Sequence, residues 1–144
     1  MTLHLVKLCV GVSAIEELQV WIDYRQGERK RLGQPPESIH TTRMIPKRVA
    51  ELLDGGSLYW VIKGNVQARQ HLIDIRPFTD KEGIKRCDLV MEPRLIATDW
   101  QPRRAFQGWR YLKVEDVPRD LRQGEGVNAL PPELRNELAE LGLL

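Results

Sequence analysis

Residues 94–111, RLIATDWQPRRAFQGWRY, combine the two side-chain types that bind single-stranded nucleic acid. Four arginines alternate there with four aromatic residues, and Asp99 is the single acid. Arginine hydrogen-bonds to phosphate, while a base that stacks on an aromatic ring gains roughly 1–3 kcal/mol. The segment therefore predicts a basic-aromatic binding surface. The alternative is that the rings are core residues and the arginines only stack on them or pair with acids.

A second basic-aromatic stretch, YWVIKG at residues 59–64, precedes this segment. In a strand, Tyr59 and Lys63 lie on one face and Trp60 on the other. If the Trp60 face is buried, Tyr59 and Lys63 point outward with Arg69 and form a basic-aromatic groove. In the inverted arrangement Lys63 lies in the mouth of a barrel, where burial lowers its pKa and makes it a candidate base or nucleophile.

Catalytic motifs are sparse in this sequence. The serines lie in no GxSxG setting, the acids show no paired spacing, and the glycine pairs do not match a phosphate-binding loop. His40, in the basic stretch IHTTR, is a candidate for catalysis or phosphate contact. Cys9 and Cys87 belong to no CxxC or Cys-His spacing, so we expect no metal site, no disulfide framework and no cofactor.

The formal net charge of +2 conceals regions of opposite sign. Residues 24–48 carry seven basic and two acidic groups, residues 60–111 carry ten and six, and residues 115–144 carry three and seven. The basic regions are either ordinary solvated faces or a surface that faces a polyanion. With 144 residues, 42% of them hydrophobic, and no long apolar run or signal peptide, we expect one cytoplasmic domain, 1–144, without membrane contact.

The elements that must position these residues begin with a strand over residues 3–10. Ser13 and Glu16 then form a capping-box pattern for an amphipathic helix that ends near Tyr24 and places Trp21 in the core. Polar and basic residues 26–42, interrupted by glycine and proline, predict a flexible loop.

A short helix is predicted between Pro46 and Gly55-Gly56, and strands follow it. Proline and glycine within residues 99–108 predict a structured loop that holds Trp100 and Phe106. Clustered strands with helices outside them indicate an α+β fold with a small, mainly antiparallel barrel or sheet. The further elements are strands at 57–63, 66–75, 86–91, 94–98 and 109–114, and a C-terminal helix at 131–141.

Several stretches resemble known families. MTLHLVKLCVG, GGSLYWVIKG, RQHLIDI and PRRAFQGWRYL are similar, over nearly the whole chain, to short alphaproteobacterial proteins known as a domain of unknown function. The order of a short helix, a YWVIKG strand, a basic hairpin and an aromatic strand resembles the PUA-like superfamily with its ASCH and EVE branches. That resemblance implies a small β-barrel that binds RNA or modified bases. It also implies that Trp60, Trp100 and Trp109 could form a base cage, with Lys63 and Arg69 near its mouth.

We therefore expect a module that binds RNA, a modified base or another nucleic acid. One alternative is a small hydrolase acting on a modified nucleoside, with Lys63 or His40 as general base. Another is a protein-interaction module in which the aromatic segment is the hot spot for a protein partner. The predicted nucleic-acid-binding residues are Trp60, Lys63, Arg69, Arg94, Trp100, Arg103, Arg104, Gln107, Trp109 and Arg110.

Overall fold

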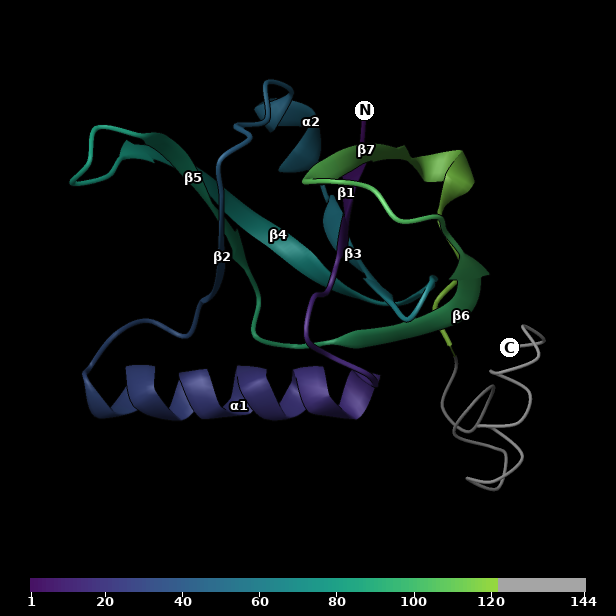
Figure 1. Ribbon diagram of the computed structural model, residues 1–144, viewed down its shortest axis with the longest axis horizontal. Helices are drawn as coiled ribbons and strands as arrows, with labels where there is room; N and C mark the ends of the chain where they lie inside the picture. The colour runs from purple at the N-terminus through teal and green to yellow at the C-terminus, as the bar shows by residue number, and fades with distance from the viewer. Residues whose placement is uncertain (122–144) are drawn as a thin grey trace.

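The computed structural model describes residues 1–121, which form a mixed α+β fold around one sheet (Figure 1). The sheet has seven strands in the order β2-β5-β4-β3-β1-β7, and β6 pairs with β4 off this path. Within the described residues the sheet is open, which confirms the α+β class and selects the sheet over the barrel. The helix predicted at 131–141 lies outside the described residues.

Every strand pair is antiparallel except β1 with β3, which is parallel. The first half of the long strand β4 pairs with β3 and β6, and its second half pairs with β5. The strands are β1 (Leu3–Leu8), β2 (Ser38–Thr42), β3 (Ser57–Ile62), β4 (Asn65–Thr79), β5 (Lys85–Met91), β6 (Ile96–Pro102) and β7 (Trp109–Lys113). The helices are α1 (Ile15–Arg31), α2 (Val49–Leu52) and the 3-10 turn η1 (Val114–Asp116).

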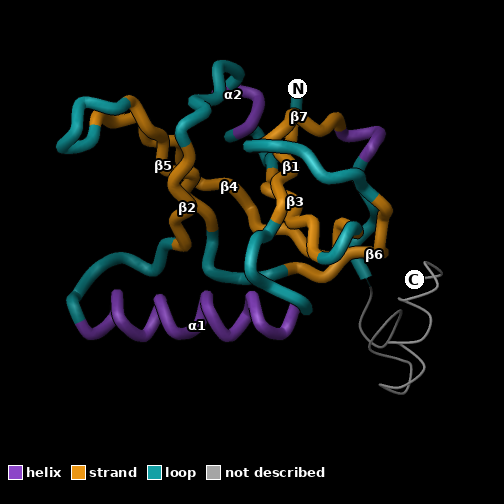
Figure 2. Tube along the Cα trace, in the orientation of Figure 1, coloured by secondary structure: helices purple, strands orange, loops and turns teal. Residues whose placement is uncertain are grey.

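Both faces of the sheet are covered, and the residues that the structure describes form two apolar clusters. Figure 2 shows α1 along one side of the strands, where Leu18 and Ile22 pack with Trp60 in the larger cluster. The smaller cluster, on the other face, contains Tyr59. All six residues of β3 are buried as a result, so the prediction that Tyr59 points outward is wrong. A central strand covered on both faces has no outward position.

Helix α1 packs on the sheet through a narrow stripe. Leu18 and Ile22 are its buried residues, whereas the Trp21 side chain is 54% exposed. Instead of entering the core, Trp21 meets the Tyr24 ring edge-on at 6.3 Å and lies under the Arg25 guanidinium. The prediction that Trp21 is a core residue is therefore wrong, because Leu18 and Ile22, together with the partly buried Ile15, make the apolar contact of α1 with the core.

The predicted loop over residues 26–42 is shorter than expected, because α1 continues to Arg31 and β2 begins at Ser38. The glutamate, arginine and lysine residues that end the helix are good helix formers, although the sequence pattern reads them as a charged loop. At its start the helix has no side-chain cap, and the Ser13 amide donates to the Glu17 carboxylate at 3.2 Å.

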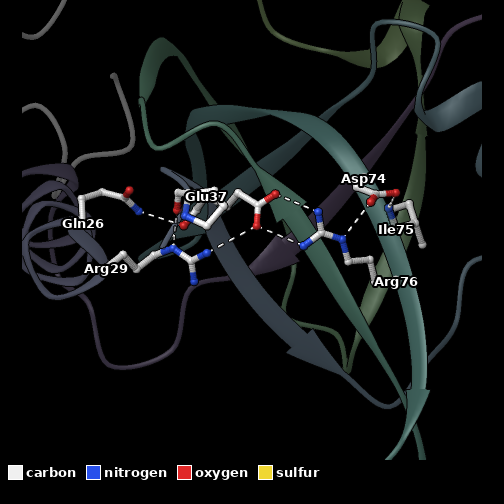
Figure 3. A network of polar contacts seen from close by, with 7 residues as sticks. Gln26, Arg29, Glu37, Asp74, Ile75 and Arg76 are labelled. Carbon is white, nitrogen blue, oxygen red and sulfur yellow. Dashed lines mark hydrogen bonds and ion pairs between the residues drawn. The ribbon is translucent and has the colours of Figure 1, made fainter. Parts of the chain in front are cut away.

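A polar network around Glu37 holds the remaining connection in place (Figure 3). The Gln26 amide donates to the Glu37 carbonyl at 2.9 Å, and Arg29 forms an ion pair with the Glu37 carboxylate at 3.4 Å. From β4, Arg76 donates two hydrogen bonds to the same carboxylate, at 3.0 and 2.8 Å, and a third to Asp74. These arginines lower the pKa of Glu37 and join α1, β2 and β4.

The predicted loop over residues 99–108 is also shorter than expected. Strand β6 continues through Trp100 to Pro102, where the proline lies at the end of a strand and its missing N–H breaks no ladder. The irregular part is residues 103–108, which we call the arginine loop.

Candidate nucleic-acid interface

The arginine loop is attached at both ends to regular structure. At its start, Pro102 pairs with Asn65 of β4, and the Arg103 amide donates to the Gly64 carbonyl at 2.8 Å. At its end, Gly108 has a positive φ of 68°, and a side chain there would collide with Met44. The loop therefore lies beside the turn between β3 and β4 and enters β7 through a position that favours glycine.

Phe106 is the centre of this loop. Its half-buried ring packs against the smaller apolar cluster. The Arg103 and Arg110 guanidinium groups lie over the ring, 5.7 and 5.4 Å from its centroid. Arg104 is exposed, and the surrounding hollow has a volume of about 420 Å³. The hollow is lined by Pro102, Arg103, Arg104, Ala105, Phe106 and Arg110.

The electrostatic character of the hollow is basic, because its lining includes three arginines and no acid. Among the described residues, none of these three arginines forms an ion pair with a carboxylate. The adjoining turn adds a fourth positive charge, since Lys63 is exposed there with a positive φ of 47°. Gln107, also exposed, adds an amide next to Phe106. Five of the ten predicted residues thus gather around Phe106.

Trp60 and Trp109 lie on the opposite face of the sheet. Their side chains are 5% and 6% exposed, and both indole N–H groups are satisfied inside the protein. Trp60 donates to the Gln70 amide oxygen at 2.9 Å, and Trp109 donates to the Met44 carbonyl at 2.7 Å. Neither ring offers an open face to a base, so the prediction that they stack or cage one has no support in this geometry.

The other predicted residues are dispersed. Arg69 donates two hydrogen bonds to Asp120, at 2.9 and 2.8 Å, and a third to the Ser57 hydroxyl, so its charge is balanced. Trp100 is half-buried on β6, and Arg94 is exposed in the connection that precedes this strand. Phe106 was not among the predicted residues, although its position between two arginine groups and before a glycine is visible in the sequence.

Of the two candidate bases, Lys63 has the outward, solvated position of the first alternative, whereas His40 differs from its expected place in a loop. Lys63 is solvated at the turn, and no described acid or hydroxyl bonds to its ammonium group. His40 lies on β2 rather than in a loop, with its ring edge-on to Trp60 at a centroid distance of 5.5 Å. Burial, together with the charges of Lys7 and Arg25, lowers the pKa of His40 to about 4, so its ring is neutral at pH 7.

The described residues contain no cluster of three or more metal-ligating side chains. Burial raises the pKa of Cys9 to about 11 and also raises that of Cys87, so both are protonated thiols at neutral pH. Among the described helices, none is long and apolar enough to cross a membrane.

The fold and the hollow together define a mixed α+β protein with a basic-aromatic surface on one face of its sheet. The chain belongs to the family described as Protein of unknown function (DUF1489), whose sequence profile matches residues 5–144. Comparisons with curated proteins and with solved structures gave no match.

Proposed function

We propose that the chain binds single-stranded nucleic acid, RNA in the first place, at the hollow around Phe106. The observation that carries this proposal is that Arg103 and Arg110 lie over one half-buried aromatic ring at the surface, while neither is neutralised by a described carboxylate. Guanidinium groups bind phosphates in a fixed, two-pronged geometry, and an aromatic ring accepts any base by stacking.

The arrangement assigns a role to each group. Arg104, in the lining of the hollow, and Lys63, in the adjoining β3–β4 turn, are both exposed and would follow the backbone phosphates. Phe106 would stack on one base, and the Gln107 amide would hydrogen-bond to the edge of a base. A duplex offers no unstacked base to such a ring, so the hollow favours a single strand or a base that is already turned out.

Fluorescence anisotropy with a short labelled single-stranded RNA tests the proposal in the full chain. We expect binding that weakens steeply as salt rises, because each neutralised phosphate releases counter-ions. The variant Arg103→Ala with Arg104→Ala should bind at least roughly tenfold more weakly. A matched control, Lys81→Ala with Lys85→Ala, removes two exposed positive charges at the β4–β5 turn and should bind nearly as the parent does. No binding at low salt, or an equal loss in both variants, contradicts the proposal.

The resemblance to the PUA-like superfamily favours the same proposal from the sequence side. From the resemblance to short alphaproteobacterial proteins we further infer a cytoplasmic protein of an alphaproteobacterium. Lys63 is a poor candidate for the general base of the hydrolase alternative, because it is solvated and does not lie beside an acid and a hydroxyl.

Protein interaction is a second candidate function, favoured by the outward surface of α1. Val20, Trp21, Tyr24 and Leu32 are 54–67% exposed there, which is an unusual apolar content for a solvated helix. Purification from the native host separates the two candidates. RNA that copurifies, and is lost with the Arg103 and Arg104 variant, supports the first. A stoichiometric protein that is lost with Trp21→Ser supports the second.

A further inference from the structure

Helix α1 has an apolar surface that the described residues leave uncovered. In Figure 1 the sheet lies on one side of α1, and no described element lies along the other. Val20, Trp21 and Tyr24 are exposed on the part of the helix that does not face the sheet. The Trp21 and Tyr24 rings meet edge-on at 6.3 Å, and the Arg25 guanidinium lies 5.8 Å from the Trp21 ring centroid. A helix surface in contact with water normally carries polar residues, so this patch indicates a contact surface.

Gly27 lies on the same surface, one turn beyond Tyr24. Its backbone is helical, and a Cβ at this position would meet no atom within 4 Å, so the described fold does not require glycine here. Glycine inside a helix lowers stability relative to alanine. The distance between two packed helices depends on the side chains at their contact. A position without a side chain therefore lets a second helix approach α1 closely.

The two ends of α1 carry charges of opposite sign. Glu16 and Glu17 lie in its first turn, and its last turn holds three basic residues, 29–31. Arg31 pairs with Glu28 in its own helix at 2.6 Å, but both side chains remain exposed and open to a further partner. Two copies of this helix packed in parallel would bring like charges together. In the antiparallel orientation each acidic end lies beside a basic end, so the helix is complementary to its own copy.

We propose that this surface is the interface of a symmetric dimer, in which α1 packs antiparallel to α1 of a second copy of the chain. Glu17 and Arg31 each lie seven residues from Tyr24, about two helical turns away on the same side of the helix. With Tyr24 at the two-fold axis, Glu17 lies opposite Arg31 of the second copy, and Val20 lies opposite its Gly27. One helix pair is a small interface, so we expect a weak dimer with a Kd in the micromolar range.

Sedimentation velocity of the full chain, from low micromolar to sub-millimolar concentration, tests the dimer. We expect a reversible equilibrium between monomer and dimer. Tyr24→Ser removes the ring at the two-fold axis and should raise the Kd at least roughly tenfold. The matched control Phe78→Ser removes an exposed ring from β4 and should dimerise as the parent does. A parent that stays monomeric throughout, or a dimer that Tyr24→Ser leaves unchanged, overturns the proposal.

The inference names the partner of the α1 surface and so rests on protein interaction, the second candidate function. It does not depend on RNA binding, because the arginine loop packs against the other face of the sheet. Tyr24→Ser should therefore bind RNA as the parent does in the anisotropy assay, so a failed dimer and a failed RNA site are distinguishable. A different stoichiometric protein that is lost with Trp21→Ser, together with a monomeric parent, would show that the second copy is the wrong occupant.

Charge-reversal variants test the antiparallel orientation. Glu17→Arg places two positive charges together across the interface, and Arg31→Glu places two negative charges together, so each variant alone should dimerise more weakly than the parent. An equimolar mixture of the two variants should dimerise again, because every positive charge then lies opposite a negative one. Circular dichroism of each variant checks that the helix is retained. A mixture that dimerises no better than the separate variants overturns the antiparallel pairing of α1.

Discussion

Aromatic rings lie next to basic side chains on both faces of the sheet, but the rings are buried on one face and border the solvent on the other. On the α1 face, Trp60 and Trp109 are buried and hydrogen-bonded, so their rings stabilise the core. On the opposite face, Phe106 is half-buried under Arg103 and Arg110, so its ring borders the solvent. A basic-aromatic pattern in a sequence therefore identifies a binding surface only after the burial of each ring is known.

The largest expected difference between the faces concerns stability. Trp60→Ala should lower the free energy of unfolding by about 3–5 kcal/mol, because it leaves a cavity and strands the Gln70 amide in the core. Trp109→Ala should have a similar effect, since the Met44 carbonyl loses its donor. Urea denaturation monitored by circular dichroism measures both. A loss below about 1 kcal/mol would show that these rings are not core residues.

On the face that carries Phe106, we expect a large loss of RNA affinity and a small loss of stability. Phe106→Ala should weaken RNA binding by roughly 1–3 kcal/mol while costing less stability than either tryptophan change. Phe106→Tyr keeps an aromatic face and serves as the matched control, with affinity close to that of the parent. Anisotropy and urea denaturation on the same preparations separate the two effects. Equal affinity in the alanine variant contradicts stacking on this ring.

A smaller effect, of opposite sign, is expected at Lys7. Lys7→Met should raise the free energy of unfolding by about 1 kcal/mol, because it replaces a half-buried charge that no described carboxylate pairs with by an apolar side chain of similar length. Lys81→Met, at an exposed turn, should change stability little. Denaturation of the parent and both variants measures this effect. A clear loss of stability in Lys7→Met would show that the lysine is already compensated.

The stability should also depend on pH, and His40 on the α1 face contributes to this dependence. The pKa of His40 is lowered to about 4 in the folded chain, so between pH 6.5 and pH 4 the unfolded chain binds a proton that the folded chain does not. Stability should therefore fall as the pH decreases through this interval. His40→Gln should make the profile flatter. An unchanged profile would show that His40 titrates normally.

Much of the fold could be predicted because local patterns determine it. The apolar run at the start of the chain, the adjacent strands predicted at 57–63 and 66–75 and the short helix after Pro46 all correspond to observed elements. The alternation of residues along β3 is visible in the sequence too, but the burial of both faces of this strand is not. A sequence window does not show that a second layer covers the other face, and so Tyr59 was placed outward.

The remaining differences have the same origin in tertiary contacts. The last turns of α1 are polar, and the ion pairs between Arg29, Arg76 and Glu37 that fix the following segment join residues far apart in the sequence. Whether a tryptophan is a binding residue depended on Gln70 and Met44, which complete the hydrogen bonds of Trp60 and Trp109 from distant positions. Phe106 belongs to the predicted basic-aromatic segment, but the sequence does not show that it, rather than a tryptophan, lies between the arginines.

We expect RNA to bind the face of the sheet that carries Phe106 and not the face that carries Trp60 and Trp109. NMR chemical-shift mapping of the full chain with single-stranded RNA tests it most directly, because the indole N–H signals of Trp60 and Trp109 report on the other side of the sheet. We predict that the amide signals of the arginine loop and of Lys63 and Gly64 shift, while both indole signals stay in place. Large indole shifts without a change at Phe106 would contradict the account.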